Sequence, residues 1–160
     1  MYIHRACLTL LIVCIHLSSL LGQRSSPLQI EKDAAVYKLL ESYHHYTELD
    51  RLLQQWASNY SSIAQVFSIG KSYSGRSLFV TRLTSPLPTG ADRDEQQILK
   101  PKFKWIANMH GDEVIGRELM LALIYHLLLN SKSDARINRL LSSTDIYIMP
   151  TMNPVSQFDR

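Results

Sequence analysis

The stretch KFKWIANMHGDEVIGRELMLALIYHLLL, residues 102–129, indicates the fold class of this 160-residue chain. Its opening part, 102–107, has the composition of a β-strand. The run Val114–Leu129 is apolar on nearly every side, as expected for a helix packed against a sheet. Only the segment Asn108–Glu113 connects the two. The stretch therefore predicts a strand, a tight turn and a buried helix.

A second helix is predicted upstream of this stretch. Leu49, Leu52, Leu53 and Trp56 fall at positions i, i+3, i+4 and i+7, which places them on one side of an α-helix. Thr47 precedes them and is the expected N-cap, since a threonine hydroxyl can accept a hydrogen bond from the first free backbone N–H groups.

The remaining patterns complete an α/β fold. Residues 64–69 and 78–83 predict two strands, and the glycine- and serine-rich segment 70–76 between them predicts a hairpin turn. Ser133 is the expected N-cap of a short helix that ends at Leu141, and a buried strand follows at 145–150. The order hairpin, strand, helix, helix, strand predicts an α/β fold with a mixed β-sheet flanked by helices.

The amino-terminal residues predict export. Residues 1–22 have the polar, positive start and apolar stretch of a signal peptide, and that stretch is short for a membrane anchor. Residues 23–42 are weakly patterned and are taken as a lead-in to a domain spanning 43–160. Cys7 and Cys14 both lie in the signal, so a metal site in the exported chain would use His, Asp and Glu. Asn59 begins a glycosylation sequon, which fits a secreted protein.

Composition argues against two other classes of protein. The formal net charge is only +3, and the basic cluster Lys100, Lys102 and Lys104 alternates with Pro101 and Phe103. A nucleic-acid-binding surface requires a denser basic face, so no nucleic acid partner is expected. Apart from the signal, no segment predicts a membrane span.

The turn between strand and helix carries the candidate site. His110 and Glu113 lie at the carboxyl end of a predicted strand, where open α/β sheets bind ligands, and both are zinc-ligand types. The HExxH and HxxEH patterns are excluded, because position 111 is Gly and position 114 is Val. The alternative is a surface turn in which Glu113 only favours the helix N-terminus by its charge.

Four ordered blocks of sequence resemble the zinc metallocarboxypeptidases of the regulatory branch, similar to carboxypeptidases D, E, M and N. The blocks are residues 43–49, residues 68–72 with 75–78, residues 108–113 with 116–119, and residues 152–154. The resemblance covers roughly the first half of a catalytic domain. It implies a secretory-pathway exopeptidase that removes C-terminal Lys or Arg from peptides, with His110 and Glu113 as zinc ligands.

The end of the chain departs from this family. The family's Met-Asn-Pro block continues with Asp-Gly, whereas here Val155–Arg160 follows. In the family the third zinc ligand, the general base and the carboxylate-binding Arg come later, so this chain alone is expected to be inactive and to expose a sheet edge. Val-Ser can be encoded GTAAGT, a common intron start, which suggests an incompletely spliced transcript; the genomic sequence tests this.

No other histidine is expected to replace the third ligand. His126 lies about 20 Å from Glu113 along the predicted helix. His44 and His45 are interpreted as solvated or packing residues. Two alternatives to the enzyme remain open: a non-catalytic secreted protein that binds peptide or protein C-termini, and an unrelated exported α/β module whose His-Glu turn is structural.

Overall fold

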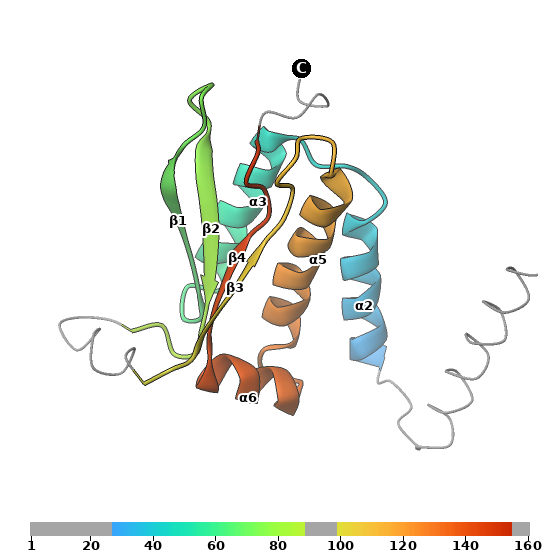
Figure 1. Cartoon of the computed structure of the whole chain (residues 1–160). Coiled ribbons are helices and arrows are strands. Elements are labelled where there is room, and N and C mark those ends of the chain that lie inside the picture. Colours follow the sequence, from blue (N-terminus) through green and yellow to red (C-terminus); the bar gives the residue numbers. More distant parts are fainter. Residues whose placement is uncertain (1–26, 89–98, 155–160) are drawn as a thin grey trace, which may run out of the picture. The chain divides into compact units, whose positions relative to one another are not determined.

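The computed structural model describes residues 27–88 and 99–154 (Figure 1). The chain divides into two compact units after Glu31, and of the first unit only residues 27–31 are described. The second unit contains the sheet and the helices packed on it. The predicted signal peptide at 1–22 and the divergent end at 155–160 both lie outside the described residues.

The sheet is mixed, as predicted. In the part of the chain that the structure describes, its four strands follow the order β1-β2-β4-β3. β1 pairs antiparallel with β2, β2 pairs antiparallel with β4, and β4 pairs parallel with β3. Because β3 and β4 are parallel, their carboxyl ends lie at the same end of the sheet, and the candidate site lies there. The strand bounds are Ala64–Lys71 (β1), Ser77–Leu83 (β2), Lys102–Ile106 (β3) and Asp145–Met149 (β4).

Of the four helices within the described residues, three lie where the sequence predicts them. Their bounds are Tyr46–Asn59 (α3), Val114–Asn130 (α5) and Ala135–Ser143 (α6). The fourth, α2 at Pro27–Leu39, was not predicted, because its apolar residues do not gather on one side. The lead-in segment therefore contains a regular helix.

Two predicted N-caps are wrong. Helix α3 begins at Tyr46 with His45 as its N-cap, two residues before Thr47. The N-cap of α6 is Asp134, whose side chain accepts hydrogen bonds from the backbone N–H groups of Arg136 and Ile137. Ser133 instead accepts a hydrogen bond at its hydroxyl from Lys32. A carboxylate accepts such backbone bonds more strongly than a hydroxyl does, which favours Asp134.

The core lies between the sheet and helices α3 and α5, which cover the same face (Figure 1). On β4, Ile146 and Ile148 point into this core, while Tyr147 and Met149 alternate onto the opposite face. The two helices contribute side chains that are completely shielded from water, among them Leu49, Leu121, Ile124 and Leu128.

No helix of the described ranges is long and apolar enough to cross a bilayer alone. Helices α5 and α6 taken together have sufficient length and composition, but they are bent by 105° at the break between them.

Candidate functional site

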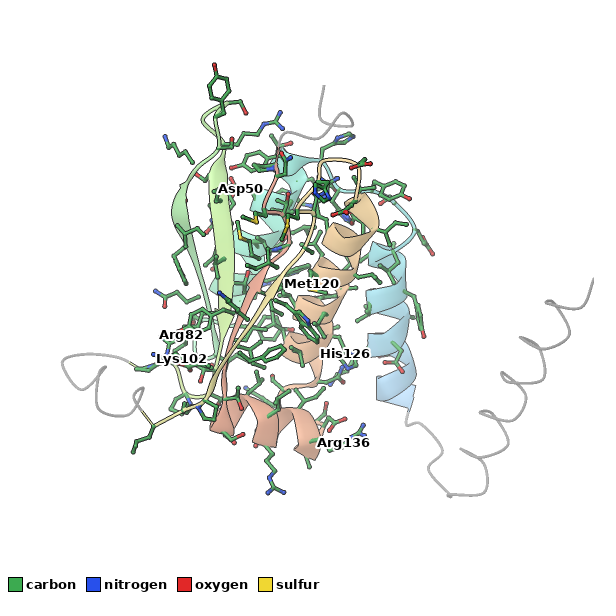
Figure 2. The ribbon with its side chains drawn as sticks, viewed as in Figure 1. Asp50, Arg82, Lys102, Met120, His126 and Arg136 are labelled. Atoms are coloured by element: carbon green, nitrogen blue, oxygen red, sulfur yellow. The ribbon has the colours of Figure 1, made fainter. Side chains whose placement is uncertain are left out.

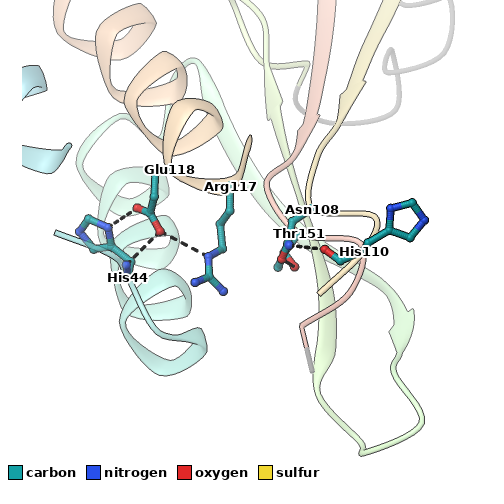
Figure 3. Close-up of polar contacts among 6 residues, drawn as sticks. All are labelled: His44, Asn108, His110, Arg117, Glu118 and Thr151. Carbon is teal, nitrogen blue, oxygen red and sulfur yellow. Dashed lines mark hydrogen bonds and ion pairs between the residues drawn. The ribbon is translucent and has the colours of Figure 1, made fainter. Parts of the chain in front are cut away.

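The candidate site begins at Asn108, directly after β3. Asn108 has a positive φ of 49°, a left-handed conformation that asparagine tolerates better than most residues. Its buried side chain makes two hydrogen bonds of 2.7 Å: Nδ2 donates to the carbonyl oxygen of His110, and Oδ1 accepts from the hydroxyl of Thr151 (Figure 3). Asn108 therefore joins the turn that carries His110 to the chain that follows β4.

Backbone hydrogen bonds continue this junction past the ends of both strands. Met152 N donates to Ala107 O and Asn153 N donates to Asn108 O, each at 3.0 Å. The helix also approaches closely, since a Cβ added at Gly116 would lie 3.3 Å from the Cβ of Ala107. These contacts hold the turn between β3, β4 and the first turn of α5.

His110 and Glu113 meet at the surface of this turn. Nδ1 of His110 lies 2.8 Å from Oε1 of Glu113, and the His110 backbone N–H donates to Oε2 at 3.2 Å. The side chains are 72% and 54% exposed, so an ion in solvent can reach both. The sequence-predicted pair is thus brought together.

The contact changes the protonation of both groups. The hydrogen bond and the negative charge of Glu113 raise the pKa of the His110 imidazole above its ordinary value of 6.5. The same hydrogen bond, with the one from the His110 backbone, lowers the pKa of Glu113 below 4.5. At neutral pH Glu113 is therefore a carboxylate beside an imidazole that binds its proton more strongly than usual.

Glu113 does not act as a hydrogen-bonding cap of the helix. It occupies the N-cap position of α5, yet its side chain makes no capping hydrogen bond. Both carboxylate oxygens are directed to His110 instead. The negative charge of Glu113 nevertheless lies at the N-terminus of α5, so the geometry is compatible with both interpretations of the turn that the sequence left open.

A buried ionic cluster lies behind the turn, and the sequence analysis did not assign it. Oε2 of Glu118 is 2.6 Å from Nδ1 of His44, and Oε1 accepts from the His44 backbone N–H at 2.9 Å and from Arg117 Nε at 3.4 Å (Figure 3). Of the two roles that the sequence left open for His44, solvated or packing, the structure shows the packing role. The adjacent charged residues Arg117 and Glu118 in the apolar run of α5 could have indicated such a cluster from the sequence, because buried charges require partners.

Three sequence blocks that are far apart in the chain converge beside the site. The Arg76 guanidinium lies 5.4 Å from the centre of the Tyr46 ring and donates to the carbonyl oxygen of Pro154. The Tyr46 hydroxyl donates to the carbonyl oxygen of Ser77 at 3.2 Å. The hairpin, the start of α3 and the segment after β4 are thereby connected.

Two further histidines in the described part of the chain, His126 and His45, lie outside the turn that carries His110 and Glu113. His126 is on α5, where its ring and backbone oxygen contact Asn130 one turn later, far along the helix from the turn (Figure 2). His45 is exposed at the start of α3. Among residues 27–88 and 99–154, no group of three His, Cys, Asp or Glu side chains could hold a metal ion.

Comparison with known proteins gives the family of this chain. The family model described as zinc carboxypeptidase matches residues 49–154, which include the His110–Glu113 turn and the four strands of the sheet. The chain belongs to the zinc carboxypeptidase family. This excludes the alternative of an unrelated α/β module.

The similar proteins in this family include regulatory-branch enzymes. The chain is 46% identical to carboxypeptidase M of Mus musculus over 112 residues, which is 70% of this chain and 24% of that protein. It is 39% identical to carboxypeptidase D of Anas platyrhynchos over 70% of this chain and 8% of that protein. The chain therefore spans a quarter or less of the length of these relatives.

Solved carboxypeptidase structures have the same fold over this region. Carboxypeptidase A from Helicoverpa armigera superimposes with a TM-score of 0.57 at 26% identity, covering 71% of this chain and 25% of that one. Thrombin activatable fibrinolysis inhibitor gives 0.61 at 21% identity, covering 71% and 26%. The predicted fold, a mixed sheet with flanking helices resembling part of a zinc carboxypeptidase domain, is confirmed.

Proposed function

We propose that His110 and Glu113 are two zinc ligands of a carboxypeptidase site. The observation that carries the proposal is the 2.8 Å separation of Nδ1 and Oε1 on an exposed turn. This separation is less than the sum of two zinc–ligand bonds of about 2 Å each, so both atoms can reach one ion. Imidazole nitrogen and carboxylate oxygen are also the donor types that catalytic zinc sites use.

The surrounding residues would hold these ligands in place. Asn108 is hydrogen-bonded to the backbone of His110 and to Thr151, which restrains the turn before any ion binds. The exposed Glu113 carboxylate is ionised at neutral pH, as a metal ligand must be. When bound in such a site, zinc polarises a carbonyl group and lowers the pKa of its water.

We further propose that the activity of the whole protein is removal of C-terminal Lys or Arg from peptides in the secretory pathway. The resemblance to the regulatory branch and the identity to carboxypeptidases M and D support this substrate class. The signal-like residues 1–22 support export. This chain would contribute the two ligands, and the third ligand and the general base would be needed in addition.

Zinc titration by calorimetry tests the ligand assignment. We expect the wild-type chain to bind one zinc ion, and His110→Gln and Glu113→Gln each to weaken binding at least tenfold, since each removes one of two direct ligands. His126→Gln is the matched histidine control and should leave the affinity unchanged. Equal affinity in all four proteins would refute the assignment.

A peptide assay tests the substrate class. Zinc-dependent release of lysine from a peptide ending in Lys, without release of leucine from a matched peptide ending in Leu, is the expected result for the catalytic protein. Activity that persists with a chelator, or that favours the Leu peptide, would contradict the proposal.

A second candidate is a non-catalytic protein that binds peptide C-termini. It is favoured by the finding that the described ranges hold no group of three His, Cys, Asp or Glu side chains placed to bind a metal. Peptide binding that a chelator does not change, without lysine release, would support this candidate over the enzyme.

A further inference from the structure

The glycosylation sequon lies where α3 ends and the chain turns toward β1. Asn59 is the last residue of α3, and Tyr60 is the C-cap of the helix. Asn59 and Ser61, which define the sequon, are both exposed. Within the described residues, neither of these two side chains makes a hydrogen bond to another residue. The Asn59 amide and the Ser61 hydroxyl are therefore free to take part in the attachment of a glycan.

This acceptor is unique in the sequence and remote from the zinc turn. None of the other four asparagines has Ser or Thr two positions later. Tyr46, at the start of α3, lies beside the candidate site, and Asn59 lies at the other end of the helix, about 20 Å away along its axis. A glycan on Asn59 would leave the His110–Glu113 turn open.

Asn59 also lines a cavity beside the end of α3. The cavity has a volume of about 510 Å³, and its walls come from α2, the turn after α3, the segment after β2, the end of α5 and α6. The side chains of Ile63, Leu128 and Leu141 give it an apolar part, and all three are buried. The cavity is thus built by segments that the fold brings together from across the chain.

Polar groups border the same cavity. Ser62 and Lys132 are exposed, and Nδ2 of Asn138 donates to the carbonyl oxygen of Ser131 at 3.1 Å. These side chains supply a hydroxyl, an ammonium group and an amide around the apolar part. A sugar ring has faces of C–H groups and a rim of hydroxyl groups, so an apolar surface bordered by such groups is suited to bind it.

We propose that Asn59 carries an N-linked glycan and that the innermost sugars of this glycan occupy the cavity. The proposal rests on export of the chain, which is part of the proposed function. The first sugar would be attached to a side chain that itself lines the cavity. Its effective concentration there is on the order of millimolar, so weak contacts are sufficient to hold it. The occupant belongs to the chain itself, and no partner protein is required.

The attachment is a group transfer from a lipid-diphosphate-linked oligosaccharide of the endoplasmic reticulum. The side-chain nitrogen of Asn59 forms a bond to the anomeric carbon of the first sugar. The bond from that carbon to the phosphate oxygen breaks, and the lipid diphosphate leaves with the bonding electron pair. The amide nitrogen loses one proton to a base, and nothing is oxidised or reduced.

Cell-free translation of the full chain with endoplasmic reticulum microsomes tests the modification. We expect one band of slower migration, which treatment with a peptide-N-glycosidase removes. Asn59→Gln and Ser61→Ala should each abolish this band, whereas Ser61→Thr preserves the sequon and should retain it. Ser62→Ala is the matched control, because it changes the adjacent exposed serine outside the sequon and should also retain the band.

Protection from added protease separates this inference from the proposed export. A chain that the microsomes protect, but that keeps its unmodified migration, would refute the glycan and leave the export intact. A chain that the protease degrades would contradict both. A slower band that persists in Ser61→Ala would refute Asn59 as the acceptor.

Hydrogen exchange on the glycosylated chain from cultured cells tests occupancy of the cavity. The amides of residues 128–132 lie beside the cavity but far from Asn59 in the sequence, so attachment alone does not protect them. We expect their exchange to be at least about threefold slower in the glycosylated chain than in Asn59→Gln, because a bound sugar must leave before this region opens. Trimming the glycan to a single sugar with endoglycosidase H should preserve this protection.

A variant that fills the cavity provides the second test of occupancy. Ser62→Phe keeps the sequon but places an aromatic ring at the cavity, so it should abolish the glycan-dependent protection of 128–132. Ser74→Phe adds the same ring to the exposed hairpin turn and should retain the protection. Equal exchange with and without the glycan, or protection that persists in Ser62→Phe, would show that the sugars lie outside the cavity and would overturn its assignment.

Discussion

Nδ1 of His44 lies 2.6 Å from Oε2 of Glu118, although the two residues are 74 positions apart in the sequence. The side chains are only 6% and 7% exposed. The other carboxylate oxygen, Oε1, accepts a hydrogen bond from the His44 backbone. Glu118 thus ties the chain that enters α3 to the first turns of α5, directly behind the turn that carries His110.

Removing this carboxylate should strongly destabilise the fold. Glu118→Ala is expected to lower the free energy of unfolding by about 3–5 kcal/mol, because His44 and the buried Arg117 lose a charged partner. The measurement is urea denaturation. Glu48→Ala removes an exposed carboxylate that is 3.9 Å from Arg51, and should cost less than about 1 kcal/mol. Similar decreases in the free energy of unfolding for Glu118→Ala and Glu48→Ala would contradict this role of Glu118.

The Thr151 hydroxyl should contribute to zinc affinity through Asn108. Thr151→Val leaves the buried Asn108 oxygen without its donor, which should lower the free energy of unfolding by about 1–3 kcal/mol. Zinc binding should weaken about tenfold, as for other groups that orient ligands. Thr151→Ser keeps the hydroxyl and should keep the affinity. An equal loss of zinc affinity in Thr151→Ser would show that the hydrogen bond to Asn108 is not the cause.

The His110–Glu113 contact predicts a specific pH dependence. The pKa of His110 is raised, so its contribution to stability is complete below the unfolded value near 6.5 and is lost as pH rises through the folded pKa. The pKa of Glu113 is lowered, so its contribution is present above 4.5 and is lost as pH falls through the folded pKa. Because protons compete with zinc at His110, zinc affinity should fall as pH drops through the raised pKa.

NMR titration of the His110 ring measures this coupling directly. Glu113→Gln should return the pKa of His110 toward 6.5, since the hydrogen bond and charge of Glu113 are the main causes of the shift. Asp112→Asn is the control, because the charge of Asp112 is the smallest of the named causes. A larger decrease in the pKa of His110 with Asp112→Asn than with Glu113→Gln would show that Asp112, and not Glu113, is the main cause of the shift.

The N-cap of α6 can be tested in the same way. Asp134→Ala removes the acceptor for two backbone N–H groups and should lower the free energy of unfolding by about 1 kcal/mol. Ser133→Ala changes an adjacent exposed hydroxyl and should have a smaller effect. The hydrogen bonds from Arg136 and Ile137 lower the pKa of Asp134, so the cap should weaken as pH falls through that lowered value. If Ser133→Ala destabilised the protein more than Asp134→Ala in thermal denaturation, Ser133 and not Asp134 would be the N-cap.

Several elements of the fold could be predicted from local sequence because their patterns are unambiguous. The apolar stripe from Leu49 to Trp56 forms one side of α3, and the long apolar run forms α5. The hairpin was equally clear from two β-rich runs around a glycine-containing turn. Helix α2 could not be predicted, since its residues lack a stripe of this kind.

The site was predictable only in part. The sequence indicated that His110 and Glu113 are three positions apart at the end of a strand, where their side chains can meet. The roles of Asn108 and Thr151 depend on the parallel pairing of β3 with β4, which brings together residues 43 positions apart. Local sequence contains no information about that pairing.

The sequence by itself determined the element types, the His-Glu turn and the family to which the chain belongs, because these depend on short-range patterns and ordered blocks. The tertiary structure decided which buried charges are paired, as in His44 with Glu118, and which strands are neighbours in the sheet, as β3 and β4 are. Such contacts arise only when distant segments pack, since the cost of burying a charge depends on the partner that folding brings to it.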